Sequence, residues 1–171
     1  MRTTNQPRSR LVSRTTIRPF EERDVDEIVA LSIRAWEPVF SSFEAMMGSD
    51  LYARVHPDWR RDQAAAVRRA LVDNDTWVAE VDGRVEGFVN VVFDDAERSG
   101  EIYMVAVHPE RQRLGIGSLL TERALEAMRA RGIDLAIVAT GGDPGHAPAR
   151  ATYEKAGFTP VPQVWYSKLI D

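Results

Sequence analysis

Apolar residues recur along the chain with two periods, and each period predicts a different kind of element. Short apolar runs predict strands at residues 16–20, 76–81, 84–93, 101–107 and 133–140, and the closing segment 158–170 predicts two more. Apolar residues at steps of three and four predict helices that begin after Asp24 and at 57–72, 117–132 and 149–156. Strands and helices therefore mix along the chain, as in an α/β protein.

Turn residues set some boundaries between these elements. Asp82-Gly83 predicts a tight hairpin, because this pair supplies the positive φ angles that such turns need. Asp24 predicts a helix N-cap, and Pro38 predicts that this helix stops and a second, short one follows. The second helix carries an apolar stripe of Trp36, Phe40, Phe43 and Met47. The stripe is typical of core packing, and lining a substrate groove is the alternative.

The middle of the chain predicts a parallel pair of strands. The strand at 101–107, the helix after it and the strand at 133–140 follow one another as a right-handed crossover unit. Both strands are continuously apolar, which is typical of burial on both faces. With no internal repeat or linker, the sequence predicts one domain at 15–171 after a disordered tail at 1–14.

The composition excludes several kinds of site. The chain has no cysteine, so it has no disulfide, thiolate metal site or cysteine nucleophile. Its 3 histidines lack metal-ligand spacing, and the serine-hydrolase motif G-x-S-x-G is absent, so we expect no metal. No apolar run approaches the ~20 residues that span a bilayer. We therefore expect a soluble, cytoplasmic protein that binds no membrane.

The charge balance argues against a nucleic-acid partner. The four arginines of residues 1–14 leave 18 basic and 26 acidic residues in the remainder, a formal charge of −8. Proteins that bind nucleic acid usually show the reverse balance. A cationic small molecule or a basic peptide suits this chain better.

The stretch EIYMVAVHPERQRLGIGSLL, residues 101–120, runs from an apolar strand through a basic turn into a helix. The free amides of a helix N-terminus attract phosphate, and the glycines of Gly115–Gly117 would let an anion approach. Arg111 and Arg113 add positive charge. The turn therefore suits a phosphate-bearing cofactor, with an ordinary strand-to-helix turn as the alternative. A dinucleotide fingerprint would need glycine where Leu120 stands, and the Gly-Lys-Ser/Thr of a P-loop is absent.

Two motifs resemble those of one family. The run 112–117, QRLGIG, resembles the Q-x-x-G-x-G/A signature of the GNAT superfamily of acetyl-CoA-dependent N-acetyltransferases. Residues 105–109, VAVHP, resemble the family's fourth strand, and 149–158, ARATYEKAGF, are similar to its second block. The motifs stand in order with a helix and a strand between them, and the likeness covers residues 15–170.

The resemblance implies a mixed, mostly antiparallel sheet of about seven strands with flanking helices. Its central parallel pair, the fourth and fifth strands, would splay apart to admit the pantetheine arm of acetyl-CoA. The implied cofactor contacts are Val105, Ala106 and Val107 for pantetheine and Gln112, Arg113, Leu114, Gly115, Ile116, Gly117 and Ser118 for pyrophosphate. His146 stands where the family often has an asparagine that touches the cofactor, so it is carried over as a further contact.

Two residues are catalytic candidates. Acetyl transfer needs a neutral amine, and on the order of one lysine-like amine in a thousand is neutral at pH 7. Glu101 is carried over as the base, acting directly or through water with help from Tyr103, although a solvated strand-end glutamate is the alternative. Tyr153 is carried over as the acid for the departing thiolate, with aromatic packing as the alternative. A backbone N–H of Val105 or Ala106 would meet the oxyanion.

The expected function is therefore an N-acetyltransferase. It would move an acetyl group from acetyl-CoA to a primary amine of a small molecule or peptide, by direct attack in a ternary complex. The chain would act as a monomer or homodimer. The alternative is a non-catalytic module of the same fold that binds acyl-CoA or a partner protein. His56 and His108 are expected to be structural or exposed.

Overall fold

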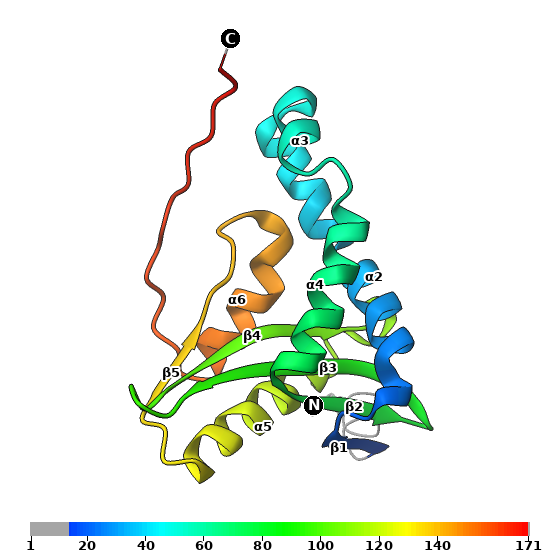
Figure 1. The fold of residues 1–171 in the computed structure, drawn as a ribbon, viewed down its shortest axis with the longest axis vertical. Coiled ribbons are helices and arrows are strands. Elements are labelled where there is room, and N and C mark those ends of the chain that lie inside the picture. The colour runs from blue at the N-terminus through cyan, green and yellow to red at the C-terminus, as the bar shows by residue number, and fades with distance from the viewer. Residues whose placement is uncertain (1–13, 171) are drawn as a thin grey trace, which may run out of the picture.

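A computed structural model describes residues 14–170, so the predicted tail of residues 1–14 lies, apart from Arg14, outside the described residues (Figure 1). The strands are β1 (Thr15–Pro19), β2 (Asp75–Val81), β3 (Arg84–Asp94), β4 (Ser99–Val107) and β5 (Leu135–Val138). The helices are η1 (Glu22–Asp24), α2 (Val25–Met47), α3 (Ser49–Val55), α4 (Trp59–Asp73), η2 (Pro109–Arg111), α5 (Ile116–Ala130), η3 (Pro144–His146) and α6 (Ala147–Lys155).

The strands form one 5-stranded sheet in the order β1-β2-β3-β4-β5. The first three neighbouring pairs are antiparallel, and β4 and β5 are parallel, which confirms the predicted crossover. The predicted hairpin is also confirmed: Asp82 and Gly83 join β2 to β3 with φ angles of 52° and 78°. The mixed sheet with flanking helices therefore has the expected class.

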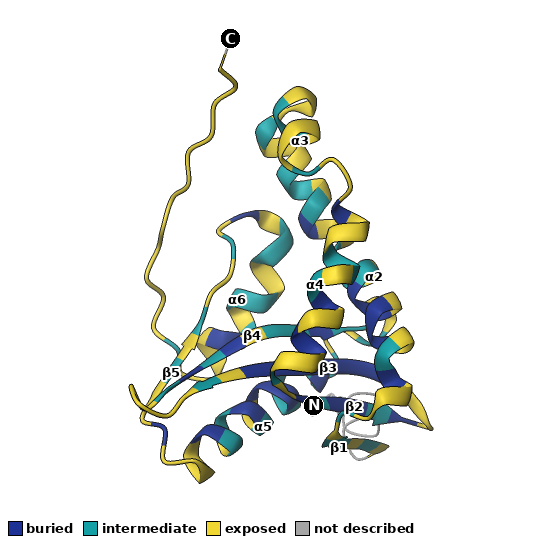
Figure 2. Ribbon diagram, viewed as in Figure 1, coloured by how far each residue is buried: buried dark blue, intermediate teal, exposed yellow. Residues whose placement is uncertain are grey.

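Two hydrophobic cores sandwich the sheet (Figures 1 and 2). Helix α5 packs against one face, where Ile116, Leu120 and Ala124 are fully buried. Helices α2 and α4 pack against the other face, through residues such as Ile28 and Val67. Their amphipathic stripes explain this, because each helix turns its apolar side to the sheet. Within residues 14–170, no helix has the length and hydropathy needed to cross a membrane.

The prediction of about seven strands is wrong for the described residues, because residues 158–170 form neither of the two predicted strands. The segment is apolar enough for a strand, and Trp165 and Tyr166 are 90% and 91% exposed. Pro160 and Pro162 cannot donate to a ladder, and no neighbouring edge pairs with the residues after them. Residues 158–170 thus have the composition of a strand, but among the described residues no strand pairs with them.

The strand predicted at 133–140 is shorter than expected and is not buried on both faces. β5 spans four residues at the edge of the sheet. Ala136 and Val138 pack toward the α5 core, whereas Leu135 and Ile137 are 53% and 44% exposed. The prediction fails because no described element covers the second face of this edge strand.

The break predicted at Pro38 is also wrong, because α2 continues through it to Met47. Packing outweighs the lost backbone hydrogen bond, since Val39, the next residue, is 6% exposed. The loop before α6 lies against this turn of the helix. A Cβ on Gly145 would come within 2.6 Å of the Val39 Cα, so only glycine permits this contact.

Candidate functional site

Strands β4 and β5 separate part-way along β4 (Figure 1). Among the described strands this pair lies at the edge of the sheet and not at its centre, because no further strand pairs with β5. Their pairing runs from Ser99 with Leu135 to Ile102 with Val138 and ends there. β4 continues to Val107, five residues beyond the last pair. The splayed parallel pair that the sequence led us to expect is therefore present.

A β-bulge marks the point of separation. Across β3 and β4, Asn90 pairs with Met104 and Val91 with Ile102, which leaves Tyr103 as an extra residue in β4. A bulge bends its strand and increases the local twist. It also changes the alternation of side chains, so that both Tyr103 and Met104 turn toward α4 and its core. The bulge thus turns β4 away from β5.

Beyond the bulge, alternate backbone groups of β4 face the gap. The amide of His108 donates to the carbonyl of Glu86 in β3. By antiparallel alternation, Ala106 also directs its amide and carbonyl at β3, while Val105 and Val107 direct theirs to the β5 side. Of the three residues predicted to pair with a cofactor arm, Val105 and Val107 have the fitting orientation, and Ala106 does not.

The turn after β4 leads directly into α5. The carboxamide of Gln112 donates to the carbonyl of Val107 at 3.2 Å, which ties the turn to the end of the strand. Gly115, the N-cap of α5, has a φ of 101°, a conformation that favours glycine. The amides of Ile116, Gly117 and Ser118 open the helix, where no intrahelical acceptor is available. The turn therefore offers several convergent N–H donors to an anion.

The two arginines of this turn differ in availability. Arg111 donates to the buried carboxylate of Glu86 at 3.3 Å and so has a structural partner. Arg113 is exposed, and none of the described residues pairs with its side chain. His108 contacts Arg34 at 2.6 Å, which supports the expected structural role of this histidine. Arg113 is thus the cation of this turn that an anion could recruit.

The second motif lies next to the first. A Cβ on Gly117 would be 3.8 Å from the Val107 side chain and 4.0 Å from that of Thr152 in α6. The end of β4, the start of α5 and the middle of α6 therefore meet. Tyr153 is 7% exposed, and its ring lies edge-on to Phe158 at 5.9 Å. Burial raises the pKa of its hydroxyl to about 12, so Tyr153 is protonated at neutral pH.

Glu101 lies on the other side of the bulge. It pairs with Val92 of β3 and Ile137 of β5, and Tyr103 follows it on the sheet face opposite α5. Among residues 14–170, no side chain binds its carboxylate, which is half-buried. A base needs this freedom to accept a proton.

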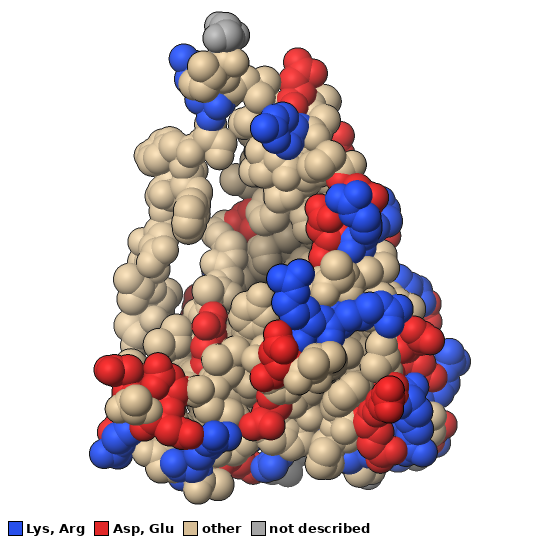
Figure 3. Space-filling model, viewed as in Figure 1, with Lys and Arg blue, Asp and Glu red and all other residues tan. Residues whose placement is uncertain are grey.

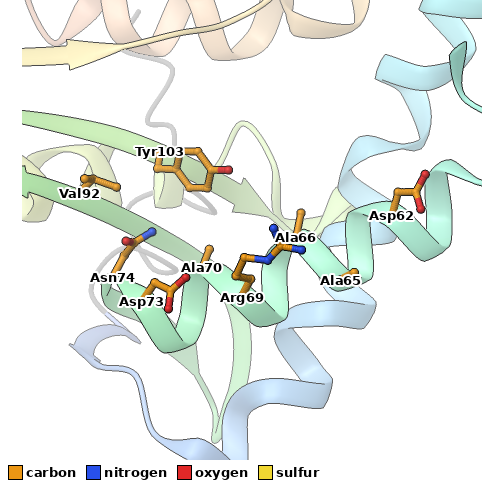
Figure 4. A pocket seen from close by; sticks show the side chains of 9 residues that line it. All are labelled: Asp62, Ala65, Ala66, Arg69, Ala70, Asp73, Asn74, Val92 and Tyr103. Carbon is orange, nitrogen blue, oxygen red and sulfur yellow. The ribbon is translucent and has the colours of Figure 1, made fainter.

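A hollow of about 520 Å³ adjoins this face of the sheet (Figure 4). Tyr103 and Val92 line it from the sheet, and Asp62, Arg69 and Asp73 line it from α4. Sequence reasoning treated α4 only as a charged amphipathic helix and missed these residues. Their spacing along the helix gave no signal, because it is also that of an ordinary solvated face.

His146 has a different environment from the expected one. Its Nδ1 lies 2.5 Å from the carboxylate of Asp143, and its ring lies 5.9 Å from that of Phe43. Burial of Asp143 opposes its ionisation, but hydrogen bonds from His146 and Ser42 outweigh this and lower its pKa. One ring nitrogen of His146 is therefore committed to Asp143. Sequence reasoning missed Asp143, although its position three residues before the histidine was a possible signal.

The apolar stripe of α2 is occupied by packing. Phe40 stacks on Trp59 of α4 at 4.2 Å, and Phe43 stacks on His56 at 5.6 Å. These contacts favour core packing over a substrate groove for this stripe. They also support a structural role for His56. In residues 14–170, no cluster of histidine and carboxylate side chains could hold a metal ion.

Comparisons with known proteins agree with this arrangement. The sequence matches the Acetyltransferase (GNAT) family over residues 37–158. Mycothiol acetyltransferase of Saccharomonospora viridis is 31% identical over 91% of this chain and 49% of its own length, and that of Beutenbergia cavernae is 49% identical over 37% and 20%. The chain thus spans at most about half of these relatives.

Solved structures share the fold. The PaiA N-acetyltransferase of Thermoplasma acidophilum, in complex with coenzyme A, matches with a TM-score of 0.66 at 19% identity, over 85% of this chain and 89% of its own. The match shows that this chain shares the fold of that protein. On the evidence of its sequence match, its two motifs and its splayed strands, the chain belongs to the GNAT acetyltransferase family.

Proposed function

We propose that this chain is an N-acetyltransferase that moves an acetyl group from acetyl-CoA to a primary amine by direct attack in a ternary complex. One observation carries the proposal: β4 leaves β5 at a bulge, and its free edge leads directly to the amides at the start of α5. Tyr153 follows Thr152 in α6, and the Thr152 side chain lies 4.0 Å from a Cβ built on Gly117, so the tyrosine stands in the element next to the start of α5.

The donor set fits coenzyme A. Val105 and Val107 would hydrogen-bond the amides of the pantetheine arm as an added strand does. The amides at the start of α5 would bind the diphosphate, with Arg113 supplying charge. Gln112 would act indirectly, because its carboxamide already holds the turn to Val107. The side chain of His146 is not included among the proposed coenzyme A contacts, because its Nδ1 is hydrogen-bonded to Asp143.

Glu101 and Tyr153 would handle the protons. Glu101 would take a proton from the ammonium group, directly or through water, so that the amine nitrogen can attack the thioester carbonyl. The amide N–H of Val105, which faces the gap, would stabilise the oxyanion. When the tetrahedral species collapses, the carbon–sulfur bond breaks, and the Tyr153 hydroxyl would give its proton to the thiolate. The nitrogen of the new amide would lose its extra proton to water, and water would in turn restore the proton of Tyr153. Burial keeps that proton in place at neutral pH.

We propose a small-molecule amine as the acceptor. The curated relatives are named for mycothiol, and a structural neighbour from soil metagenomic DNA was solved with the aminoglycoside sisomicin. The hollow beside Tyr103 lies on the face that carries Glu101. Its two aspartates outnumber its one arginine, Arg69, which favours a cationic molecule over an anionic one. An acceptor there would approach β4 from the side opposite α5.

The test follows release of free coenzyme A thiol with a library of amines. Wild type should release thiol only when an amine is present, and Glu101→Gln should lower kcat by about 10²-fold near pH 7, a typical contribution of a general base. The loss should shrink at higher pH, where the amine is already neutral. Glu97→Gln, in the exposed β3–β4 turn, is the matched control. Binding of acetyl-CoA without thiol release for any amine would instead support a non-catalytic module.

A further inference from the structure

A buried carboxylate and a partly exposed imidazole form a pair in the loop after β5. The side chains of Asp143 and His146 are 2% and 19% exposed, and their Oδ1 and Nδ1 atoms lie 2.5 Å apart. An Nδ1–H that donates to a carboxylate leaves the lone pair of a neutral imidazole on Nε2. Within residues 14–170, no group is hydrogen-bonded to this Nε2. The pair therefore has the form of an oriented proton acceptor, and the proton transfers described above do not use it.

The surroundings of the pair hold it in place. A Cβ on Gly141 would lie 2.5 Å from the Nδ1 of His146, so a larger residue at this position would displace the imidazole. Arg150 donates from Nη1 to the carbonyls of Gly141 and Asp143, the second at 2.8 Å. The glycine contact and the guanidinium thus fix the loop around Asp143, and Asp143 in turn orients His146.

The imidazole is open to water on one side. In Figure 3 the surface is hollowed between residues 159–170 and α3, and Figure 1 places the loop before α6 at this hollow. The ring of Phe43 in α2 lies 5.9 Å from the ring of His146, and 19% of the His146 side chain stays exposed. A group that takes up a proton and releases it again needs this access.

His146 and Tyr153 lie on one face of α6. His146 is the N-cap of this helix, and its φ and ψ of −87° and −1° lie in the right-handed helical region. Tyr153 follows seven residues later, which is two turns of an α-helix and places the two side chains on the same face, about 10 Å apart along the axis. Long side chains on a helix lean toward its N-terminus, so the side chain of Tyr153 leans toward His146. Water between the two would carry a proton from one to the other.

We propose that His146, held by Asp143, carries a proton from the new amide nitrogen to Tyr153, a role that rests on the proposed acetyl transfer. In the tetrahedral species the nitrogen has an extra proton, and the departing thiolate takes one from Tyr153. The N–H bond breaks, water passes that proton to the Nε2 of His146, and the Asp143 carboxylate stabilises the imidazolium. The Nε2–H bond then breaks and, again through water, the phenolate of Tyr153 regains a proton. Each turnover thus leaves both residues as they began.

The charges around His146 favour this direction of transfer. Burial opposes ionisation of Asp143, but the hydrogen bond from His146 lowers its pKa, so the carboxylate is charged when the imidazolium forms. Arg150 of α6, which also contacts this loop, has its Nη1 committed to two carbonyls. Burial raises the pKa of Tyr153 to about 12, and an imidazolium is a far stronger acid than such a phenol. The imidazolium would therefore yield its proton to the phenolate.

Release of coenzyme A thiol by His146→Asn, measured in dilute buffer, tests this relay. The asparagine carboxamide places an N–H donor where Nδ1 stands, so it keeps the bond to Asp143 but has no atom at Nε2. We expect kcat to fall by roughly 10²-fold, a typical contribution of a positioned proton-transfer group, and added imidazole to restore most of it. A purely structural role would leave kcat unchanged in this variant. Glu154→Gln, on the exposed side of α6, is the control and should keep the wild-type kcat with and without imidazole.

The outcomes separate the relay from the acetyl transfer itself. A wild-type kcat in His146→Asn, or a loss that imidazole does not restore, would overturn the relay and leave the acetyl transfer standing. A wild type that releases no thiol with any amine would refute the acetyl transfer, and the relay with it. His146→Gln, whose carboxamide likewise cannot carry a proton, replaces the asparagine variant if that variant does not fold.

Nitrogen NMR of the 3 histidines gives a readout that needs no turnover. For His146 at neutral pH we expect a proton on Nδ1 and none on Nε2, as the bond to Asp143 requires. In Asp143→Asn this preference should weaken, and kcat should fall with it. A proton on Nε2 in place of Nδ1 in the wild type would overturn the relay, because the imidazole would then have no free lone pair directed away from Asp143.

Discussion

At the scale of the residue, Tyr153 has a structural role and would combine it with the chemical role that we propose. Its ring packs against Phe158 in a buried position, and the same burial disfavours the phenolate. A hydroxyl with a pKa of about 12 is ready to donate its proton over the whole range in which an acceptor amine becomes neutral. Packing and retention of the proton at neutral pH therefore depend on the same environment at this position.

The raised pKa of Tyr153 predicts how stability depends on pH. Unfolding returns the hydroxyl to its ordinary pKa near 10, so between about pH 10 and 12 the folded state binds more protons than the unfolded state. Stability should be unaffected below this window and should fall as pH rises through it, by up to about 3 kcal/mol. Urea unfolding of wild type and Tyr153→Phe would measure the difference. Equal alkaline slopes in the two proteins would contradict the buried, protonated hydroxyl.

Arg113 predicts opposite effects on stability and binding. Its φ of 62° is a left-handed conformation that costs a non-glycine residue roughly 1 kcal/mol. Arg113→Gly should therefore raise the free energy of unfolding by up to about 1 kcal/mol and weaken coenzyme A binding, because it removes the unpaired cation of the turn. Arg113→Lys keeps both the positive charge and the left-handed backbone of a non-glycine residue. It should therefore change neither the free energy of unfolding nor the affinity for coenzyme A by much. Calorimetric binding and urea unfolding report the two effects, and tighter binding by the glycine variant would refute the role of the charge.

Sequence reasoning identified candidate residues whose proposed roles depend on the local backbone. The glycines of the α5 turn and Tyr153 belong to contiguous motifs, which can be recognised without a structure. Asp143, Asp62 and the bulge at Tyr103 were not found. Asp62 and the bulge depend on contacts between segments distant in sequence, such as the pairing of Asn90 with Met104 that produces the bulge. Asp143 contacts His146 three residues along the chain, so its spacing could have indicated the pair.

At the scale of the element, the start of α2 is fixed to the sheet by charge. Asp24 occupies the predicted N-cap position, but its side chain does not cap the helix. Both carboxylate oxygens accept from Arg18 of β1, at 2.8 and 2.9 Å, and Arg18 also donates to Glu80 of β2 at 2.8 Å. The helix that bears one hydrophobic core is thereby attached to two strands.

This attachment predicts a pH-dependent loss of stability. The hydrogen bond from Arg18 lowers the pKa of Asp24, so its stabilisation is present above the ordinary carboxyl pKa and is lost as pH falls through the lowered value. Asp24→Asn should cost roughly 2 kcal/mol at pH 7, and the gap to wild type should narrow in acid. Asp26→Asn, whose partner Arg68 is on the exposed surface, is the control and should cost little. Thermal unfolding at several pH values would measure both, and a gap independent of pH would contradict the ion pair.

The elements that sequence reasoning placed wrongly share a cause. Local propensity predicts that Pro38 ends a helix, but the helix continues to a buried Val39, and Gly145 packs against this turn. It also predicts strands in residues 158–170, yet a strand requires a free edge within reach, and sequence does not show which edge that is. By contrast, the hairpin at Asp82-Gly83 was predicted correctly, because adjacent residues alone determine it.

At the scale of the whole molecule, three distant segments form the proposed site. The end of β4, the start of α5 and the middle of α6 meet around Gly117. The sequence order of strand, helix and strand was enough to predict the parallel pair, since crossover connections are right-handed. The extent of the gap was not predictable, because it depends on where pairing with β5 stops, at Ile102.

A ligand that joins these segments should stabilise the whole fold. Coenzyme A at about 100 times its Kd should add about 2.7 kcal/mol and raise Tm by roughly 5–11 °C. Pantetheine lacks the diphosphate, so at the same concentration it should raise Tm far less. Gly115→Val should abolish most of the coenzyme A shift, because a β-branched residue is strained at a φ of 101° and the amides of α5 would move.

Gly142→Ala is the matched control for this measurement. Its Cβ would meet no atom within 4 Å, so the variant should keep the full shift with coenzyme A. Differential scanning calorimetry over a range of coenzyme concentrations would separate binding from a loss of folding, since each variant has its own Tm without ligand. An equal shift with coenzyme A and with pantetheine would mean that the amides of α5 do not hold the diphosphate. The β4 edge alone would then account for binding.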